Sequence, residues 1–352
     1  MAEPAGSEGV SRMEARMAQE IREAPAVLGR QEQGLAMPID ELVARLERRP
    51  PRVVVTCARG TSAHAATFAK HLFERHLGIP VAEAAPNIAS VYGRRLSLRG
   101  QLFLAISQSG RSDDLIEMAL AARSSGALGA AIVNDPESPL ARASDIVLPM
   151  AAGPELSVAA SKTFVAALAV LLRLTAAWTG DARLAEAIAR LPGRLAEAGT
   201  LDWSEATDAL AATSSLVTIG RGPTLPIARE ASLKLKETCH LHAEAFSGAE
   251  FLHGPVALVS SRYPLLMFTP TDEAAAGMAR LATELRQKGT ALFTTEAGAA
   301  GGGRLPALAP DHPETDAVCL IQSFYAMLIG LAARRGADVD QPRHLQKVTR
   351  TR

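Results

Sequence analysis

Two stretches of this chain repeat the same order of strand, polar loop and helix, and this repeat limits the fold more than any other feature. The run Ser215–Gly222 (SLVTIGRG) parallels Val53–Gly60 (VVVTCARG), and Leu265–Pro270 (LLMFTP) parallels Phe103–Gln108 (FLAISQ). Both pairs have the same offset of 162 residues (219 − 57 and 269 − 107). A constant offset indicates that one α/β unit occurs twice, so we expect two similar domains divided near residue 200.

Within the first unit, short β-branched or apolar runs alternate with segments of helical periodicity. Helices are expected at Thr61–Leu77 and from Ser112 to about Ser124. Strands are expected at Arg52–Cys57, Val81–Ala85, Gln101–Ser107, Gly129–Val133 and Asp145–Pro149. Strands separated by helices pair in parallel, because a parallel connection needs a long crossover. The predicted fold class is therefore α/β, with parallel sheets covered by helices on both faces.

The segments outside this alternation predict how the rest of the chain is organised. Residues 1–10 are small and polar and are expected to be disordered, whereas residues 11–48 have helical periodicity that Pro25 and Pro38 split. An Ala- and Arg-rich helix, Ala182–Glu197, is expected to bridge the two domains. The predicted segments are residues 1–50 (disordered start and helical lead-in), 51–200 (first domain), 201–336 (second domain) and 337–352 (C-terminal tail).

Charge and composition narrow the classes of function. The 352 residues hold 37 Lys+Arg and 37 Asp+Glu, so no overall basic field attracts nucleic acid. Cys57, Cys239 and Cys319 are far apart and form no metal or disulfide motif, so no metal or other cofactor is expected. The start lacks an apolar signal segment, and the apolar run Thr163–Trp178, interrupted by Arg173, is predicted to be a buried helix. We expect a cytoplasmic protein that binds neither nucleic acid nor a membrane.

The loop after one predicted strand holds more hydrogen-bonding side chains than a turn requires. It contains Ser107, Gln108, Ser109 and Ser112, with Gly110 allowing close backbone approach. In an open parallel sheet, ligands bind beyond the carboxyl ends of the strands, where helix N-termini offer free N–H groups. This loop therefore favours a phosphate ester. A helix cap accounts for Ser112, but it leaves the other three polar residues unexplained.

A second polar turn follows the first predicted strand at the same sheet edge. It consists of Arg59, Gly60, Thr61 and Ser62 and opens the next helix. Many strand–helix turns look like this one, so the turn alone is a weak signal. Two such turns on one edge favour a shared phosphate cradle more strongly than either turn does.

The segment REASLKLKETCHLHAEAFSGAEFLHGP carries candidates for proton transfer. Lys234 and Glu237 lie on neighbouring helical turns, which is also typical of an exposed helix face with an i,i+3 ion pair. Downstream, His253 lies in a His-Gly-Pro turn that could fix an imidazole at the mouth of the domain, where a carboxylate and a histidine suit proton shuttling. His240 and His242 fit structural roles better than metal binding, because no third ligand has suitable spacing.

The C-terminal segment GADVDQPRHLQKVTRTR lacks apolar periodicity, so by itself it predicts a frayed tail. A second interpretation is that Lys347 folds over a site, where a desolvated amine could form a Schiff base. The residues alone favour the frayed tail.

Taken together, these stretches resemble the sugar isomerase (SIS) family. They are most similar to the isomerase half of glucosamine-6-phosphate synthase and its stand-alone relatives. The similar pieces, in family order, are Met17–Pro25, Arg59–Lys70, Ser107–Leu115, Glu230–Glu237, His242–Pro255 and Asp338–Thr349. The KLKE, HAEA, LHGP and DVDQPR series is the most specific part of this resemblance.

The resemblance implies a doubly wound, flavodoxin-like SIS domain repeated in tandem, with a site for an amino-sugar or ketose 6-phosphate. It implies that Glu237 moves a proton between C1 and C2, that His253 assists ring opening, often from the partner subunit of a homodimer, and that Lys347 closes over the site and engages the open-chain carbonyl. The implied phosphate ligands are Ser62, Ser107, Gln108, Ser109 and Ser112, and further substrate contacts fall on Gly60, Thr61 and Lys234.

Two departures from the synthase pattern shape the expected function. Only about 50 residues precede the first strand and none is cysteine, so the synthase's glutamine-hydrolysing domain is not expected. Arg59 stands where the synthase has the cysteine of Cys-Gly-Thr-Ser. The leading hypothesis is an amino-sugar 6-phosphate deaminase/isomerase that converts glucosamine 6-phosphate to fructose 6-phosphate and ammonia. The alternatives are an isomerase or deglycase of another phosphosugar (galactosamine 6-phosphate or fructosamine 6-phosphate) and a sugar-phosphate-binding regulator without turnover.

Overall fold

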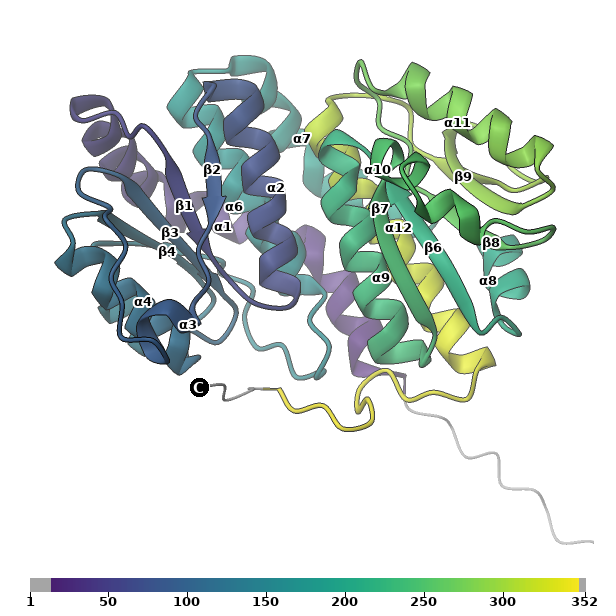
Figure 1. The fold of residues 1–352 in the computed structure, drawn as a ribbon, viewed down its shortest axis with the longest axis horizontal. Helices are drawn as coiled ribbons and strands as arrows, with labels where there is room; N and C mark the ends of the chain where they lie inside the picture. The colour runs from purple at the N-terminus through teal and green to yellow at the C-terminus, as the bar shows by residue number, and fades with distance from the viewer. Residues whose placement is uncertain (1–13, 348–352) are drawn as a thin grey trace, which may run out of the picture.

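The computed structural model describes residues 14–347 and contains two five-stranded sheets (Figure 1). The first sheet consists of β1 (Val54–Cys57), β2 (Val81–Glu83), β3 (Leu102–Ser107), β4 (Leu128–Val133) and β5 (Ile146–Pro149). The second consists of β6 (Ser215–Gly220), β7 (His242–Ser247), β8 (Pro264–Met267), β9 (Ala291–Ala297) and β10 (Arg304–Ala307). All neighbouring strands are parallel. The orders β2-β1-β3-β4-β5 and β7-β6-β8-β9-β10 are equivalent, which confirms a tandem pair of doubly wound domains.

Most of the longer helices lie between the two sheets, and shorter ones cover the outer faces (Figure 1). The inner helices are α1 (Arg16–Arg48), α2 (Thr61–Leu77), α6 (Lys162–Thr179), α7 (Ala182–Ala198), α8 (Ser204–Leu210), α9 (Leu225–Cys239) and α12 (Pro313–Arg334). The outer elements are α3 (Asn87–Ser90), α4 (Asp113–Ser124), α5 (Pro139–Arg142), α10 (Gly248–Leu252), α11 (Ala275–Gln287) and the 3₁₀ turn η2 (Pro255–Leu258); a second 3₁₀ turn, η1 (Gly222–Thr224), precedes α9. Because the inner helices pack against both halves, the division near residue 200 stays a prediction.

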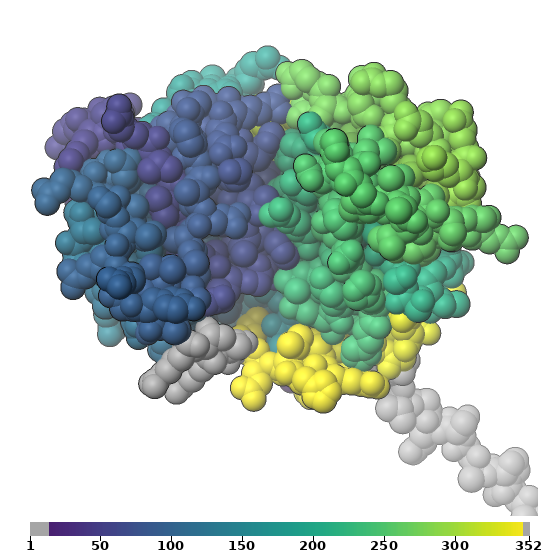
Figure 2. Space-filling model, in the orientation of Figure 1, coloured from purple at the N-terminus to yellow at the C-terminus, as the bar shows by residue number. Residues whose placement is uncertain are grey.

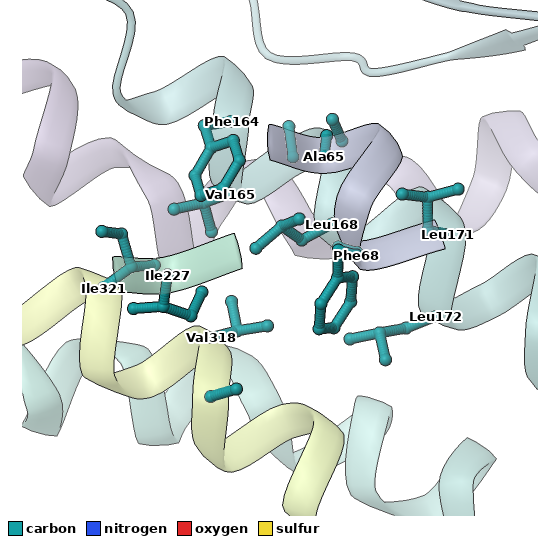
Figure 3. Packing of buried hydrophobic residues seen from close by; sticks show 14 of the residues in the cluster. Ala65, Phe68, Phe164, Val165, Leu168, Leu171, Leu172, Ile227, Val318 and Ile321 are labelled. Atoms are coloured by element: carbon teal, nitrogen blue, oxygen red, sulfur yellow. The ribbon is translucent and has the colours of Figure 1, made fainter. Parts of the chain in front are cut away.

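Each sheet separates the central core from an outer core. Along β3, Leu104 faces the central helices whereas Ala105 faces α4, so the strand is apolar on both faces up to Ser107. In the central core, Phe68 of α2 lies against Leu168 of α6, and Ile227 of α9 lies beside Val318 of α12 (Figure 3). The packing of helices from both halves joins the two domains through one apolar core.

The helices α6 and α12 are long and apolar enough to cross a membrane, judged by length and composition alone. In the structure, 78% of the apolar window of each helix is buried inside the protein. The sequence prediction of a buried helix at Thr163–Trp178 is confirmed by α6.

The lead-in is one continuous helix, α1, so the predicted split at its prolines is wrong. Pro25 and Pro38 both lie inside the helix. Pro25 has no N–H for the carbonyl of Ile21 four residues earlier, and the side-chain amide of Gln322 donates to that carbonyl at 2.9 Å. This bond from α12 replaces the lost helical bond, which explains how the helix passes through Pro25. The start predicted to be disordered, residues 1–10, lies outside the described residues.

A buried carboxylate joins the two domains near the N-terminus of α12. Glu314 is fully buried and accepts hydrogen bonds from Nε2 of His76 at 2.8 Å and Nε2 of His71 at 3.2 Å, both on α2. Arg75 of the same helix lies 3.6 Å away. Burial alone would raise the pKa of Glu314, but these three partners outweigh burial and lower the pKa to about 2.

This carboxylate predicts a distinct acid sensitivity. The pKa of Glu314 is lowered on folding, so its stabilisation is fully present above the ordinary value of 4.5 and is lost as pH falls toward about 2. Compared with Glu314→Gln, the native chain should lose up to about 3 kcal/mol more stability over that interval. Urea unfolding at several pH values measures the difference between the two proteins. If the free energy of unfolding falls with pH in parallel for the two proteins, Glu314 is not the group that causes the acid sensitivity.

Candidate active site

The two predicted polar turns meet at the carboxyl edge of the first sheet, because β1 and β3 are neighbours there. They line one pocket of about 340 Å³, which also receives residues from α9 and the C-terminal tail. Every residue predicted for the site except His253 lines this pocket. The lining residues are Arg59, Gly60, Thr61, Ser62, Ser107, Gln108, Ser109, Ser112, Val158, Ala160, Lys234, Glu237, Leu345, Gln346 and Lys347.

The loop after β3 is held by its own side chains. Ser107 Oγ accepts from the Gly110 N–H at 3.1 Å, and Ser109 Oγ accepts from the Arg111 N–H at 3.3 Å. Ser112 is the N-cap residue of α4, as predicted, but its hydroxyl makes no capping hydrogen bond. Its hydroxyl is therefore not used by the helix and lines the pocket.

Arg59 fastens the two turns to each other. Its guanidinium donates from Nε to Asp114 Oδ2 at 2.7 Å, and Nη2 contacts the same oxygen. Asp114 is buried in the first turn of α4, directly after the serine loop. The N-termini of α2 and α4 thus lie side by side at the pocket, and together they form a site with the features of an anion cradle.

Gly110→Ala should damage this cradle. Gly110 has φ +61°, and an added Cβ would lie 2.2 Å from Oγ of the buried Ser138. The strained conformation alone costs about 1–3 kcal/mol of unfolding free energy. Because the loop must move, binding of inorganic phosphate, measured by calorimetry, should weaken about tenfold.

Gly180→Ala is the matched control for that variant. Gly180 has a similar φ of +68°, and an added Cβ there would meet no atom within 4 Å. This variant should lose stability but bind phosphate normally. Equal phosphate binding by Gly110→Ala and the native chain would contradict the assignment of the cradle.

The matching loop of the second domain has different residues where the cradle has Gly110 and Ser112. Adding the offset of 162 places Asp272 at the position of Gly110 (110 + 162) and Ala274 at that of Ser112 (112 + 162). Asp272 is occupied by an ion pair to Arg75 at 2.6 Å. The second half therefore presents an acidic side chain, paired with Arg75, where the first half has Gly110.

The α9 helix brings a buried charge cluster to the pocket. Lys234 is buried, so the interpretation of this run as an exposed helix face is wrong for it. Its ammonium contacts Glu237 Oε2, donates to Thr61 Oγ1 at 3.0 Å, and lies 3.4 Å from Glu230 Oε1. Burial opposes this charge, yet Glu230 and Glu237 keep the pKa of Lys234 above its ordinary value. Lys234 is therefore a permanent cation between the phosphate turn and the carboxylate of Glu237.

Glu230 is a site residue that the sequence reasoning missed. It is fully buried and accepts from Tyr325 OH at 3.0 Å, and its other oxygen lies 2.7 Å from His64 Nδ1. Burial would raise the pKa of Glu230, but Lys234 and His64 lower it; burial and Glu230 raise the pKa of Tyr325 well above its ordinary value. Its spacing of four residues before Lys234, on the face that carries Glu237, was the available signal.

The described part of the tail is folded over the pocket and is not frayed. Figure 2 shows it in yellow along the lower face, beneath the boundary between the two halves. Lys347 Nζ donates to Ser157 O at 2.6 Å and pairs with Glu155 Oε2 at 3.1 Å. Glu155, also missed from the sequence, is buried and accepts from the N–H groups of Ser161 and Thr163 at 3.0 Å each. The last five residues of the predicted tail segment lie outside the described residues.

His253 does not reach the pocket of its own chain. It directly follows α10, at the end of the second sheet where β7 is the edge strand, and it is exposed. The flanking Leu252 and Leu258 are also exposed, at 49% and 50%. Any role of His253 in the pocket therefore requires a second chain.

Comparison with known proteins identifies the family. The model of the SIS domain matches residues 49–177 and 209–294, which is more than half of the chain. The chain belongs to the SIS domain family.

Three similar proteins place this SIS chain among its relatives. Glutamine–fructose-6-phosphate aminotransferase [isomerizing] of Zymomonas mobilis is 33% identical over 94% of this chain, which spans only 58% of that protein. The crystal structure of a "putative phosphosugar isomerase" from Silicibacter pomeroyi DSS-3 is 43% identical, covers 93% of this chain and 100% of its own, and has a TM-score of 0.88. The C-terminal domain of glucosamine-fructose-6-phosphate aminotransferase from Francisella tularensis is 27% identical, with 96% and 100% coverage and a TM-score of 0.80.

Proposed function

We propose that this protein is a phosphosugar isomerase of the SIS family that acts as an amino-sugar 6-phosphate deaminase/isomerase. The reaction converts glucosamine 6-phosphate and water to fructose 6-phosphate and ammonia. One observation carries the proposal: a single pocket has a polar phosphate cradle at one side and the carboxylate of Glu237 with buried Lys234 at the other. The relatives support the sugar, because the names of two of them contain fructose 6-phosphate.

The phosphate side of the pocket fixes one end of the substrate. Hydroxyl groups of Ser62, Ser107, Ser109 and Ser112, the amide of Gln108 and the N-termini of α2 and α4 supply donors for phosphate oxygens. The Thr61 hydroxyl accepts from Lys234, so the cradle and the proton-transfer group are joined by a direct hydrogen bond. This connection fixes where the sugar carbons lie relative to Glu237.

The sugar side of the pocket suits an amino group. Among the residues that line the pocket, Glu237 supplies a carboxylate, and it lies beside Lys234. A protonated amine on C2 of the sugar can donate a charge-assisted hydrogen bond to this carboxylate. Glucose 6-phosphate has a hydroxyl at C2 in place of the amine and cannot form this charge-assisted bond.

The proton steps follow from this arrangement. With the sugar in its open-chain form, the aldehyde at C1 acidifies the C2 proton, and Glu237 takes it. Glu237 then returns a proton to C1, which leaves a C2 imine that water hydrolyses to the ketone and ammonia. Lys347 stabilises the open-chain oxygen as a cation, and His253 assists ring opening from the partner subunit of a homodimer.

A substrate panel tests the proposal. Glucosamine 6-phosphate, galactosamine 6-phosphate, fructosamine 6-phosphate and glucose 6-phosphate are each supplied to the purified protein, and ammonia and ketose 6-phosphate are measured. We expect equal amounts of ammonia and fructose 6-phosphate from glucosamine 6-phosphate. Turnover of another member alone would favour the isomerase or deglycase, whereas binding without turnover of any member would favour a regulator.

A further inference from the structure

The first helix of the chain begins without a cap of its own. The residue before α1 is Ala15, which offers no side-chain acceptor, and the first turn contains no acidic residue. The first N–H groups of a helix need acceptors, and the positive end of its dipole favours a carboxylate. Asp340 of the C-terminal tail supplies both: its Oδ2 accepts from the Arg16 N–H at 2.8 Å and its Oδ1 from the Met17 N–H at 2.9 Å.

The same aspartate holds the loop that forms one wall of the pocket. Its Oδ1 also accepts from Ser157 Oγ at 3.2 Å, and its backbone carbonyl accepts from the Val158 N–H at 3.2 Å. Glu20, one turn into α1, accepts from the Ser157 N–H at 3.2 Å. The start of α1, the loop around residues 155–160 and the tail therefore meet at Asp340.

The tail is fastened to this loop at two points. Asp340 is the first, and Lys347 is the second through Glu155 Oε2 and Ser157 O. Residues 343–346 between them are exposed. Without the Asp340 side chain, the end of the tail depends on the ion pair of Lys347. That pair must then offset the conformational entropy that the segment gains when it is free.

From these contacts we propose that Asp340 is a positioning residue, which uses the N-terminus of α1 to place the Lys347 ammonium over the pocket. The inference rests on the proposed function, because it gives Lys347 a role at the sugar. Asp340 does not itself line the pocket, although its carbonyl accepts from the lining residue Val158, so it acts through the tail and the loop. The first N–H groups of α1 thereby help to hold the tail in place over the pocket.

Limited trypsin digestion tests the anchor without any substrate. Arg343 is an exposed trypsin site between the two fastening points. In Asp340→Ala, cleavage after Arg343, followed by mass spectrometry, should be about tenfold faster than in the native chain. Asp340→Asn keeps the shape and some acceptor capacity and should give an intermediate rate. Asp208→Asn, which breaks an exposed pair with Arg334 on another surface, should cleave at the native rate.

A double-mutant cycle then tests whether Asp340 acts through Lys347. Asp340→Ala should lower kcat about 10- to 100-fold in the native background, because the ammonium is displaced. It should have no further effect on kcat in the Lys347→Met background, whereas a purely structural role would lower kcat in both. Unchanged cleavage after Arg343, or equal effects in the two backgrounds, would overturn the proposal. If the native chain turns over no phosphosugar, the proposed function fails, and the digestion still decides whether Asp340 anchors the tail.

Discussion

Glu237→Gln is expected to lower kcat on glucosamine 6-phosphate by about 10²- to 10⁴-fold, the range for loss of a positioned proton-transfer group. The substitution keeps the shape of the side chain but removes the carboxylate that takes the C2 proton. KM should change much less, because the phosphate cradle on the first domain is untouched. Steady-state kinetics with an ammonia readout measures both constants.

The control for this variant is Glu244→Gln. Glu244 lies on β7, is exposed and does not line the pocket. It carries the same change of charge and should leave kcat and KM at native values. A Glu237→Gln protein with native kcat would remove Glu237 from the mechanism.

Lys234→Met is expected to give the largest loss of stability, about 3–5 kcal/mol, because it leaves buried carboxylates without their cation. Glu230 is fully buried and Glu237 is largely so, and the Lys234 ammonium lies against both. Activity should fall as well, since Glu237 loses the partner that orients it. Chemical unfolding monitored by circular dichroism measures the free-energy change.

Two further variants make this prediction sharper. Lys236→Met changes an exposed lysine two residues away on the same helix. Its ammonium donates only to neutral groups, Ser232 Oγ and the Ala243 carbonyl, so the variant should cost about 1 kcal/mol. Adding Glu230→Gln to Lys234→Met removes the buried negative charge and should restore part of the stability but none of the activity. If Lys234→Met is as stable as Lys236→Met, the buried cluster is not a charged one.

The fold could be predicted because its signals are local. The ends of β1 and β3 lie within two residues of those predicted from the β-branched and apolar runs, and the constant offset predicted the second sheet. The lead-in was misjudged at Pro25 because the compensating bond comes from Gln322, 297 residues later in the chain (322 − 25). No local pattern carries a contact of that kind.

The candidate site likewise contains residues that a local motif could predict and residues that depend on contacts distant in the chain. Ser107, Ser109 and Lys234 lie in short motifs, so the sequence could name them, and the structure brings them into one pocket. Glu155 had no such signal, because its role depends on the tail folding back to present Lys347. Ser112 is the N-cap residue that local rules favour, but in the structure its hydroxyl makes no capping bond.

The most direct test of the account is the fate of the sugar hydrogens in D₂O. Glucosamine 6-phosphate is incubated with the native protein in D₂O, and the products are followed by NMR and mass spectrometry. A proton carried by Glu237 from C2 to C1 exchanges in part with solvent, so the account predicts fructose 6-phosphate with deuterium at C1 and equimolar ammonia. Glu237→Gln should form both products about 10²- to 10⁴-fold more slowly. Recovery of bound sugar phosphate without deuterium and without ammonia would contradict it.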